Sequence, residues 1–272
     1  MRNIFKTLTV ALFLFVQRPA SASAYAWGAQ GHQLIVEMAM SLLNPAAKQR
    51  VMEILNGYPI DNAAVWMDSV RRIVPEWRYM DNWHFLNMDK GQTYAEAGSD
   101  SDVVFRLNQV IADFQHPETI SPDSLPIKLR VLFHLMGDIT QPLHVGYGSD
   151  VGGNTVRVKV SGTKFKYDNN LHKVWDDAII VDGKINLDSL QKYYAALDQD
   201  KKDKIIAGST QDWMTQARSY LPAAYQFNQV KRGTSQISDQ YLDDNVDTVL
   251  QQLVYAAIRL ANTLNSAFGN QS

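Results

Sequence analysis

The chain has 272 residues, 46% of them hydrophobic, and a formal net charge of −2 at pH 7. This size and apolar content suit one domain with a substantial core, and the lack of cysteine excludes disulfide bonds as a source of stability. The negative charge is not typical of nucleic-acid-binding domains, which normally carry basic patches.

Residues 1–26 have the features of a secretory signal peptide. Two basic residues introduce an apolar run at residues 8–16, and a small-x-small cleavage pattern ends at Ala26. The run is too short to span a membrane comfortably, and no later stretch approaches the roughly 20 apolar residues of a membrane helix. We therefore expect cleavage after Ala26 and no membrane insertion of the mature chain.

Cleavage at this point would make Trp27 the first residue and give it a free α-amino group. The mature chain would carry 23 basic against 28 acidic side chains, a net charge of about −5. An α-amino group and its own carbonyl oxygen can chelate one metal ion together. His32, five residues further on, can add an imidazole.

The spacing of apolar residues predicts a mainly helical chain. Asn44-Pro45 separates the first two predicted helices, and Pro45 suits the first position of the second. The last predicted helix repeats apolar residues along one face, which indicates packing against a core rather than a coiled coil. The predicted helices cover residues 33–43, 46–55, 61–70, 107–114, 122–138 and 239–267.

One segment alternates in the manner of a β-strand. Val156, Val158 and Val160 alternate with basic residues, and a turn at residues 161–162 leads into a second short stretch that ends at residue 166. Its basic positions suit a solvated face or contact with a polyanion. Residues 91–102 and 145–154 have the length of functional loops, and nothing divides residues 27–272 into two domains. The sequence thus predicts one all-α domain with a small β-hairpin.

Two pairs of residues have spacing that suits metal binding. His134 precedes Asp138 by four residues, and His172 precedes Asp176 by four. On a helix this spacing places both side chains on one face, and imidazole with carboxylate is a ligand set that suits zinc. A core histidine hydrogen-bonded to an aspartate is the alternative explanation for either pair alone.

Further candidates strengthen the case for metal. His144 follows Asp138 closely, while Asp68 and His84 lie in aromatic surroundings. Taken together with His32 and the amine of Trp27, these residues favour a metal site over isolated core histidines. His116 precedes a proline in a polar stretch and is left out as a surface residue.

The ordered motifs resemble the zinc-dependent, single-strand-specific nucleases of the S1 and P1 type. The resemblance runs from Trp27 to about Asp176. The motifs that carry it are Trp27-Gly28-x-x-Gly31-His32, Trp66-x-Asp68, Trp83-His84-Phe85, His134-x-x-x-Asp138-x-x-x-Gln141-Pro142-Leu143-His144, Gly152-Gly153-Asn154 and His172-x-x-x-Trp175-Asp176.

The resemblance implies three zinc ions in one cleft and assigns a ligand set to each. It implies an all-α fold like that of the P1-type nucleases and phospholipase C. Asp138 would bridge two of the ions, and every implied position is filled by the expected residue type. The first ion would be held by Asp68, His84, His134 and Asp138; the second by His144, His172 and Asp176; the third by the Trp27 amine and carbonyl, His32 and Asp138.

The implied activity is that of an endonuclease and 3′-nucleotidase, which hydrolyses phosphodiester bonds of single-stranded RNA and DNA to 5′-phosphate products. Three zinc ions against three aspartates give a local charge of about +3, so an acidic protein can bind a phosphodiester. A zinc-activated hydroxide would attack phosphorus. Catalytic roles would fall on Asp68, Asp138 and Arg71. The guanidinium of Arg71 can stabilise negative charge on the phosphoryl group.

Substrate contacts are implied for three further residues. Phe85 would stack on an unpaired base, which favours single strands. Asn87 stands where some relatives carry Asp, so base preference is not implied by the resemblance. Asn154, in the Gly-Gly-Asn loop, is the third expected contact. The missing cysteines point to a bacterial exported enzyme, periplasmic or secreted, which we expect to be a monomer.

Two alternatives remain open at this stage. Zinc-dependent phospholipases C share the resembling fold and metal cluster, but they have a longer gap between the terminal Trp and the first His, and Glu as the last ligand. This chain has a five-residue step from Trp27 to His32 and has Asp176. The second alternative is an exported zinc-binding protein without catalysis, which would lack an open coordination position.

Overall fold

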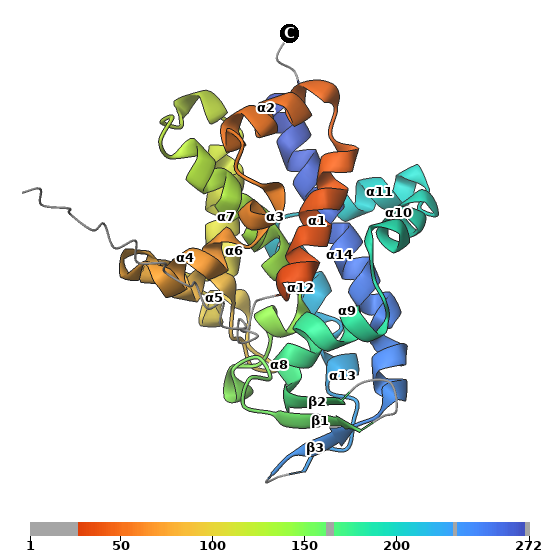
Figure 1. Ribbon diagram of the computed structural model, residues 1–272. Helices are drawn as coiled ribbons and strands as arrows, with labels where there is room; N and C mark the ends of the chain where they lie inside the picture. The colour runs from red at the N-terminus through yellow and green to blue at the C-terminus, as the bar shows by residue number, and fades with distance from the viewer. Residues whose placement is uncertain (1–26, 162–165, 231–232, 270–272) are drawn as a thin grey trace, which may run out of the picture.

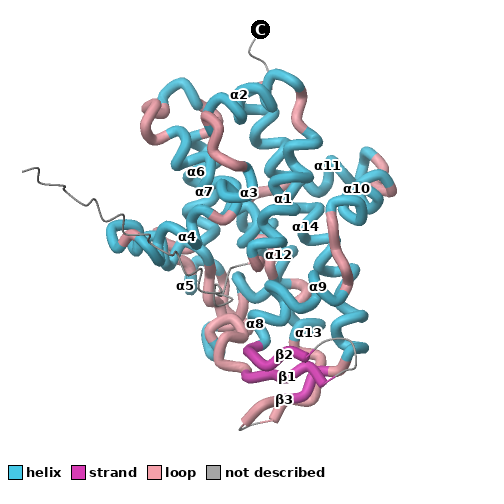
Figure 2. Tube along the Cα trace, viewed as in Figure 1, coloured by secondary structure: helices cyan, strands magenta, loops and turns pink. Residues whose placement is uncertain are grey.

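The computed structural model describes residues 27–161, 166–230 and 233–269, so the predicted signal peptide at residues 1–26 lies outside the described residues. Helices make up most of the described chain, and the strands form one small sheet (Figure 2). This confirms the mainly helical fold class. Nowhere in the described ranges is a helix both long and apolar enough to cross a membrane.

The helices and strands are labelled in Figure 1. They are α1 (Ala29–Leu42), α2 (Pro45–Leu55), α3 (Ile60–Ala64), α4 (Trp66–Ile73), η1 (Pro75–His84), α5 (Tyr94–Ala97), α6 (Val103–Asp113), η2 (Pro117–Thr119), α7 (Leu125–Asp138), η3 (Pro142–Val145), η4 (Gly148–Asp150), β1 (Arg157–Ser161), β2 (Lys166–Asn170), α8 (Leu171–Lys173), η5 (Val174–Ala178), α9 (Ile179–Asp182), α10 (Leu187–Ala195), α11 (Gln199–Ile206), α12 (Thr210–Arg218), α13 (Leu221–Ala224), β3 (Ser235–Ile237) and α14 (Asp239–Phe268).

The long C-terminal helix α14 forms the centre of the fold. It contacts α1, α7 and α9 along its length (Figure 1). The face that the sequence predicted is the one it buries, with Leu242, Val249, Leu253, Leu260 and Leu264 all fully inside. Burying such side chains stabilises the fold by about 1.5–3 kcal/mol each. The site-bearing helices α1 and α7 are thus held on a rigid support.

The prediction of one helix over residues 61–70 is wrong, because the structure has two helices there. α3 ends at Ala64 and α4 begins at Trp66, with Val65 between them at φ −106° and ψ 8°. In a continuous helix the Ala64 carbonyl would accept a hydrogen bond from the backbone four residues on. Here it lies 3.0 Å from His134 Nδ1 instead. The break therefore frees a carbonyl oxygen that orients a histidine.

The predicted hairpin is confirmed, but its second strand lies later in the chain than predicted. β2 begins at Lys166, where the predicted second strand ended, and residues 162–165 lie outside the described chain. β1 and β2 pair antiparallel, and Val158 and Val160 are buried. β3 adds a third strand, parallel to β1, that the sequence did not predict. The basic positions of β1, Arg157 and Lys159, are exposed. The sheet lies at one end of the molecule, and β2 leads directly into α8 (Figure 1).

Candidate metal centre

Eight side chains with metal-ligating chemistry converge from seven separate segments. Each of them is 8% exposed or less. They are His32 on α1, Asp68 on α4, His84 at the end of η1, His134 and Asp138 on α7, His144 in η3, His172 on α8 and Asp176 in η5.

Both pairs predicted from spacing share a face. His134 Nε2 lies 3.5 Å from an oxygen of Asp138, and His172 Nε2 lies 3.6 Å from an oxygen of Asp176. The second pair crosses from α8 into η5, which is a π-helical turn. Such turns are rare and occur often at functional sites, because the wider turn redirects a side chain.

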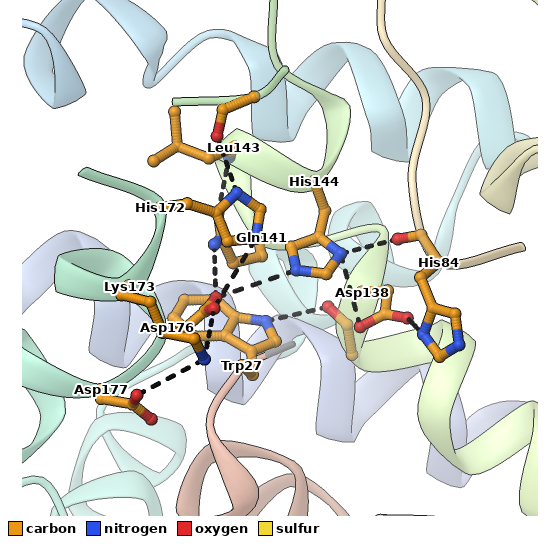
Figure 3. Close-up of polar contacts among 12 residues, drawn as sticks. Trp27, His84, Asp138, Gln141, Leu143, His144, His172, Lys173, Asp176 and Asp177 are labelled. Atoms are coloured by element: carbon orange, nitrogen blue, oxygen red, sulfur yellow. Dashed lines mark hydrogen bonds and ion pairs between the residues drawn. The ribbon is translucent and has the colours of Figure 1, made fainter. Parts of the chain in front are cut away.

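Asp138 is the centre of the cluster. Its two oxygens lie 3.3 Å from His32 Nε2, 3.0 Å from His84 Nδ1, 3.5 Å from His134 Nε2 and 3.6 Å from His144 Nδ1. Figure 3 shows His84 and His144 on either side of this carboxylate. Burial opposes its ionisation, but the surrounding imidazoles outweigh burial and hold the pKa of Asp138 well below its usual range. It is therefore an anion at neutral pH.

Two of the histidines, in contrast, are held neutral. Burial and the neighbouring His32 lower the pKa of His134 to about 3, and burial lowers the pKa of His144 to about 4. Asp68 is also buried, but His134, His84 and Arg71 lower its pKa to about 2. Neutral imidazoles beside ionised carboxylates are the protonation states that bind a metal ion.

The ring orientations of three histidines leave the same nitrogen available. Nδ1 of His134, His144 and His172 lies 3.0, 2.6 and 2.7 Å from the carbonyl oxygens of Ala64, His84 and Gly152 respectively. A carbonyl oxygen only accepts, so each Nδ1 carries the proton and donates it. The lone pair of each ring is therefore on Nε2, as in metal-binding histidines whose other ring nitrogen donates to a carbonyl oxygen.

Buried polar atoms without partners show that the residues fit a metal. Among the described residues, seven such atoms belong to this cluster: His32 Nδ1 and Nε2, His84 Nε2, His134 Nε2, Asp138 Oδ1, His144 Nε2 and Asp176 Oδ2. Leaving one polar group buried and unsatisfied costs on the order of 1–3 kcal/mol. Cations placed among these atoms would satisfy them together.

The ligand atoms divide into three groups that largely match the implied ligand sets. His144, His172 and Asp176 form one group, and Asp68, His84 and His134 form another. The third joins His32 and Asp138 with His134, whose ring stacks on that of His32 at 3.9 Å. His134 thus lies between two groups, whereas the resemblance assigned only Asp138 to two ions.

Trp27 is held against this cluster by two hydrogen bonds. Its indole Nε1 donates to the Gly137 carbonyl at 2.9 Å, and the next backbone N–H, that of Gly28, donates to the Asp176 carbonyl at 2.8 Å. A Cβ at Gly28 would lie 1.6 Å from Asp177 Oδ1 and 3.2 Å from the Asp176 carbonyl oxygen, so any other residue here would displace the Asp177 carboxylate. Trp27 is thereby fixed beside Gly137 and Asp176.

A pocket of about 180 Å³ opens onto this cluster of metal-ligating side chains. It brings together the predicted substrate-contacting residues Phe85, Asn87 and Asn154, together with Arg71. Arg71 donates to Asp68 at 2.9 Å and to Asp81 at 3.2 Å. The full lining is Arg71, Asp81, His84, Phe85, Asn87, Leu143, His144, Val151, Asn154, His172, Lys173 and Asp176. Trp27, His32, Asp68, His134 and Asp138 do not line it.

Two residues of this site received no role from the sequence. Lys173 is 5% exposed, and its Nζ lies 3.2 Å from Asp176 and 3.6 Å from Asp177. Gln141 Nε2 donates to the second oxygen of Asp176 at 2.7 Å. Figure 3 shows both side chains directed at that carboxylate. The spacing of Lys173 to Asp176 and Asp177 is a helical i, i+3 and i, i+4 pattern, so this signal was present in the sequence.

The buried neutral histidines make the stability of the metal-free protein depend on pH. Unfolded histidines bind protons below about pH 6.5, whereas His134 and His144 stay neutral in the fold, so stability falls as the pH drops below 6.5. Each contributes a loss of about 2 kcal/mol at pH 5. Asp68 and Asp138 are ionised in both states above pH 5 and do not contribute to this change. Thermal unfolding in chelator should therefore have a midpoint several degrees lower at pH 5 than at pH 7.5; equal midpoints would contradict the buried neutral imidazoles.

Known proteins that resemble this chain in sequence are nucleases. Residues 27–269 match the S1/P1 Nuclease family model. Similar proteins include Endonuclease 3 of Arabidopsis thaliana, 28% identical over 90% of both chains, and Nuclease P1 of Penicillium citrinum, 24% identical over 90% of this chain and 99% of that protein. Nuclease S1 of Aspergillus oryzae (strain ATCC 42149 / RIB 40) is 23% identical over 56% of this chain and 54% of its own.

The match covers all of the described chain and every residue of the metal cluster. It decides against a zinc-dependent phospholipase C, one of the two alternatives that the sequence left open. It also favours an enzyme over a zinc-binding protein without catalysis. The chain belongs to the S1/P1 nuclease family.

Proposed function

We propose that this chain is a zinc-dependent endonuclease and 3′-nucleotidase that hydrolyses phosphodiester bonds of single-stranded RNA and DNA to 5′-phosphate products. The observation that carries the proposal is the set of seven buried ligand atoms that make no hydrogen bond and lie directly behind an open pocket. S1/P1 nucleases are zinc-dependent hydrolases of ester bonds, and this donor set suits zinc.

Nine residues would hold three zinc ions. When bound, zinc supplies Lewis-acid chemistry: it acidifies water and neutralises charge on a phosphoryl group. The three ligand sets would be Asp68, His84, His134 and Asp138; His144, His172 and Asp176; and Trp27 through its amine and carbonyl, His32 and Asp138.

Side chains of the protein would orient the phosphodiester beside the zinc ions. Arg71 is 24% exposed and hydrogen-bonded to Asp68, which holds its guanidinium at the pocket wall. From there it would neutralise charge that develops on the phosphoryl oxygens. Lys173, which also lines the pocket, would hold the Asp176 carboxylate in place through its contact of 3.2 Å.

Selectivity for single strands would come from Phe85. Its half-buried ring lines the pocket, and a second cavity of about 250 Å³ that also includes Asn82, Asn87 and Asp102 lies beside it. A base can stack on this ring only when it has left its duplex neighbours. Asn87 would meet the base edge through its amide, and Asn154, whose Nδ2 donates to the Val151 carbonyl, would border the strand.

Removing the Phe85 ring should weaken substrate binding more than it slows the hydrolysis step. We expect Phe85→Ala to raise KM for a single-stranded polyribonucleotide about tenfold, the loss of one stacking contact, with a smaller change in kcat. Phe85→Tyr keeps the ring and is the matched control. The measurement is steady-state release of acid-soluble nucleotides; an unchanged KM for the alanine variant would remove Phe85 from the binding site.

The test of the proposed function uses protein that begins at Trp27. A single-stranded polyribonucleotide and its duplex form are incubated with it, with and without chelator. Chelator-sensitive release of 5′-mononucleotides, faster from the single strand, is the expected result. Bound zinc without any cleavage of either form would overturn the proposal.

We further propose that residues 1–26 are removed on export and that residues 27–272 form one catalytic domain that acts as a monomer. The signal-like sequence of residues 1–26 and the contacts of Trp27 beside Asp138 support this division. Export to the periplasm or the medium, by a bacterial cell, would suit a chain that lacks cysteine and gains stability from its metal ions.

A further inference from the structure

An exposed patch of aromatic rings and one arginine lies on η1 and α6. We call it the aromatic patch and define it as Tyr79, Trp83, Phe105 and Arg106. Tyr79 and Trp83 meet edge to face with ring centroids 5.4 Å apart. The Arg106 guanidinium lies 4.5 Å from the Trp83 ring centroid and 5.5 Å from that of Phe105. The four side chains therefore form one continuous surface.

This patch is unusual because its large rings face solvent. Tyr79 is 59% exposed and Phe105 is 40% exposed. Within the described part of the chain, Arg106 Nε is buried without a hydrogen-bond partner, while its Nη1 donates to Gln109. A cation held against exposed ring faces is the combination that binds unstacked bases and the phosphates between them.

The patch is carried by the same two segments of the chain that border the candidate active site. Trp83 directly precedes His84, and the Phe85 carbonyl accepts a hydrogen bond from the Val103 N–H at the start of α6. The cavity of about 250 Å³ beside Phe85 is bordered by Asn82 and Asp102. The Asp102 carboxylate accepts from the Phe105 N–H at 2.9 Å and so caps the helix that carries Phe105 and Arg106. The segments that border this cavity at Asn82 and Asp102 therefore also carry the patch, and we place the patch on the path of a strand that leaves Phe85 through the cavity.

We propose that the aromatic patch binds further nucleotides of the same single strand whose phosphodiester lies at the metal centre. The proposal rests on the proposed function and names an extended binding surface for its substrate. Bases would stack on Tyr79 and Phe105, and Arg106 would pair with a backbone phosphate. Affinity should therefore rise with strand length beyond the nucleotides that the pocket holds.

Binding of nuclease-resistant strands tests this surface without reference to turnover. The probes are fluorescein-labelled phosphorothioate thymidine oligonucleotides of about 12 and about 2 nucleotides, titrated with zinc-loaded protein and followed by anisotropy. We expect the double variant Tyr79→Ala/Phe105→Ala to raise Kd for the longer strand about tenfold or more. Kd for the dinucleotide, which is too short to leave the pocket, should change less than twofold.

Two controls make the result specific. Tyr79→Phe keeps the ring and should bind the longer strand as the unchanged protein does. Ile73→Ala removes another exposed apolar side chain, on α4, and should have no effect on either Kd. An unchanged Kd for the longer strand, or an equal loss for both lengths, would overturn the proposal. So would variants that alter only self-association in light scattering, because the patch would then bind a second copy of the chain. Failure of hydrolysis alone would count against the proposed function and not against this surface.

Discussion

Replacing Asp138 by Asn is expected to abolish hydrolysis and to lower the zinc content of the protein. Asp138 lies within 3.6 Å of four imidazoles and is fully buried. Asparagine keeps the size of the side chain but removes its charge, and its amide nitrogen does not bind metal. We expect kcat/KM to fall about 1,000-fold, which corresponds to about 4 kcal/mol of transition-state stabilisation.

Two measurements separate loss of metal from loss of fold. Zinc per chain, determined by atomic emission, should drop below three, while the circular dichroism spectrum should keep its helical shape. Asp188→Asn is the matched control, because Asp188 is exposed and pairs only on the surface with Lys192; it should keep full activity. An Asp138→Asn protein with three zinc ions and normal turnover would exclude Asp138 as a ligand.

An extension of two residues before Trp27 is expected to remove one zinc ion and to reduce kcat/KM about 100-fold. A free α-amino group has a pKa near 8 and binds metal in its neutral form, whereas a peptide nitrogen has no available lone pair. The indole bond to Gly137 and the Gly28 bond to Asp176 do not involve this amine. The extension therefore changes the ligand while leaving the docking of Trp27 in place.

The matched control carries the same two residues after Ser272, at the other end of the chain. It should bind three zinc ions and retain full activity. The extended and control proteins are compared by zinc content and by hydrolysis of a single-stranded polyribonucleotide. Equal activity would show that the α-amino group is not a ligand. The expected result would also mean that a chain still carrying residues 1–26 lacks one of the zinc ligands.

Much of the fold could be predicted from local signals. Pro45 opens α2, as the sequence indicated, and the apolar repeat of α14 identified the face that is buried. These features depend on residues within one or two turns of each other. The break at Val65 was missed because its cause is distant: the Ala64 carbonyl serves His134, 70 residues away. Strand β3 was missed because three residues give little periodicity, and the strand gains its hydrogen bonds only from β1.

By itself, the sequence determined which residues have metal-binding chemistry and which pairs share a helix face. His134 with Asp138 and His172 with Asp176 follow from helical spacing alone, since four residues make about one turn. Only the tertiary structure decided that Asp138 contacts four imidazoles, that His134 lies between two groups, and that Lys173 and Gln141 both hold Asp176. Those contacts join segments far apart in the chain, and their geometry depends on how α1, α4, α7 and η5 pack around α14, which local spacing does not encode.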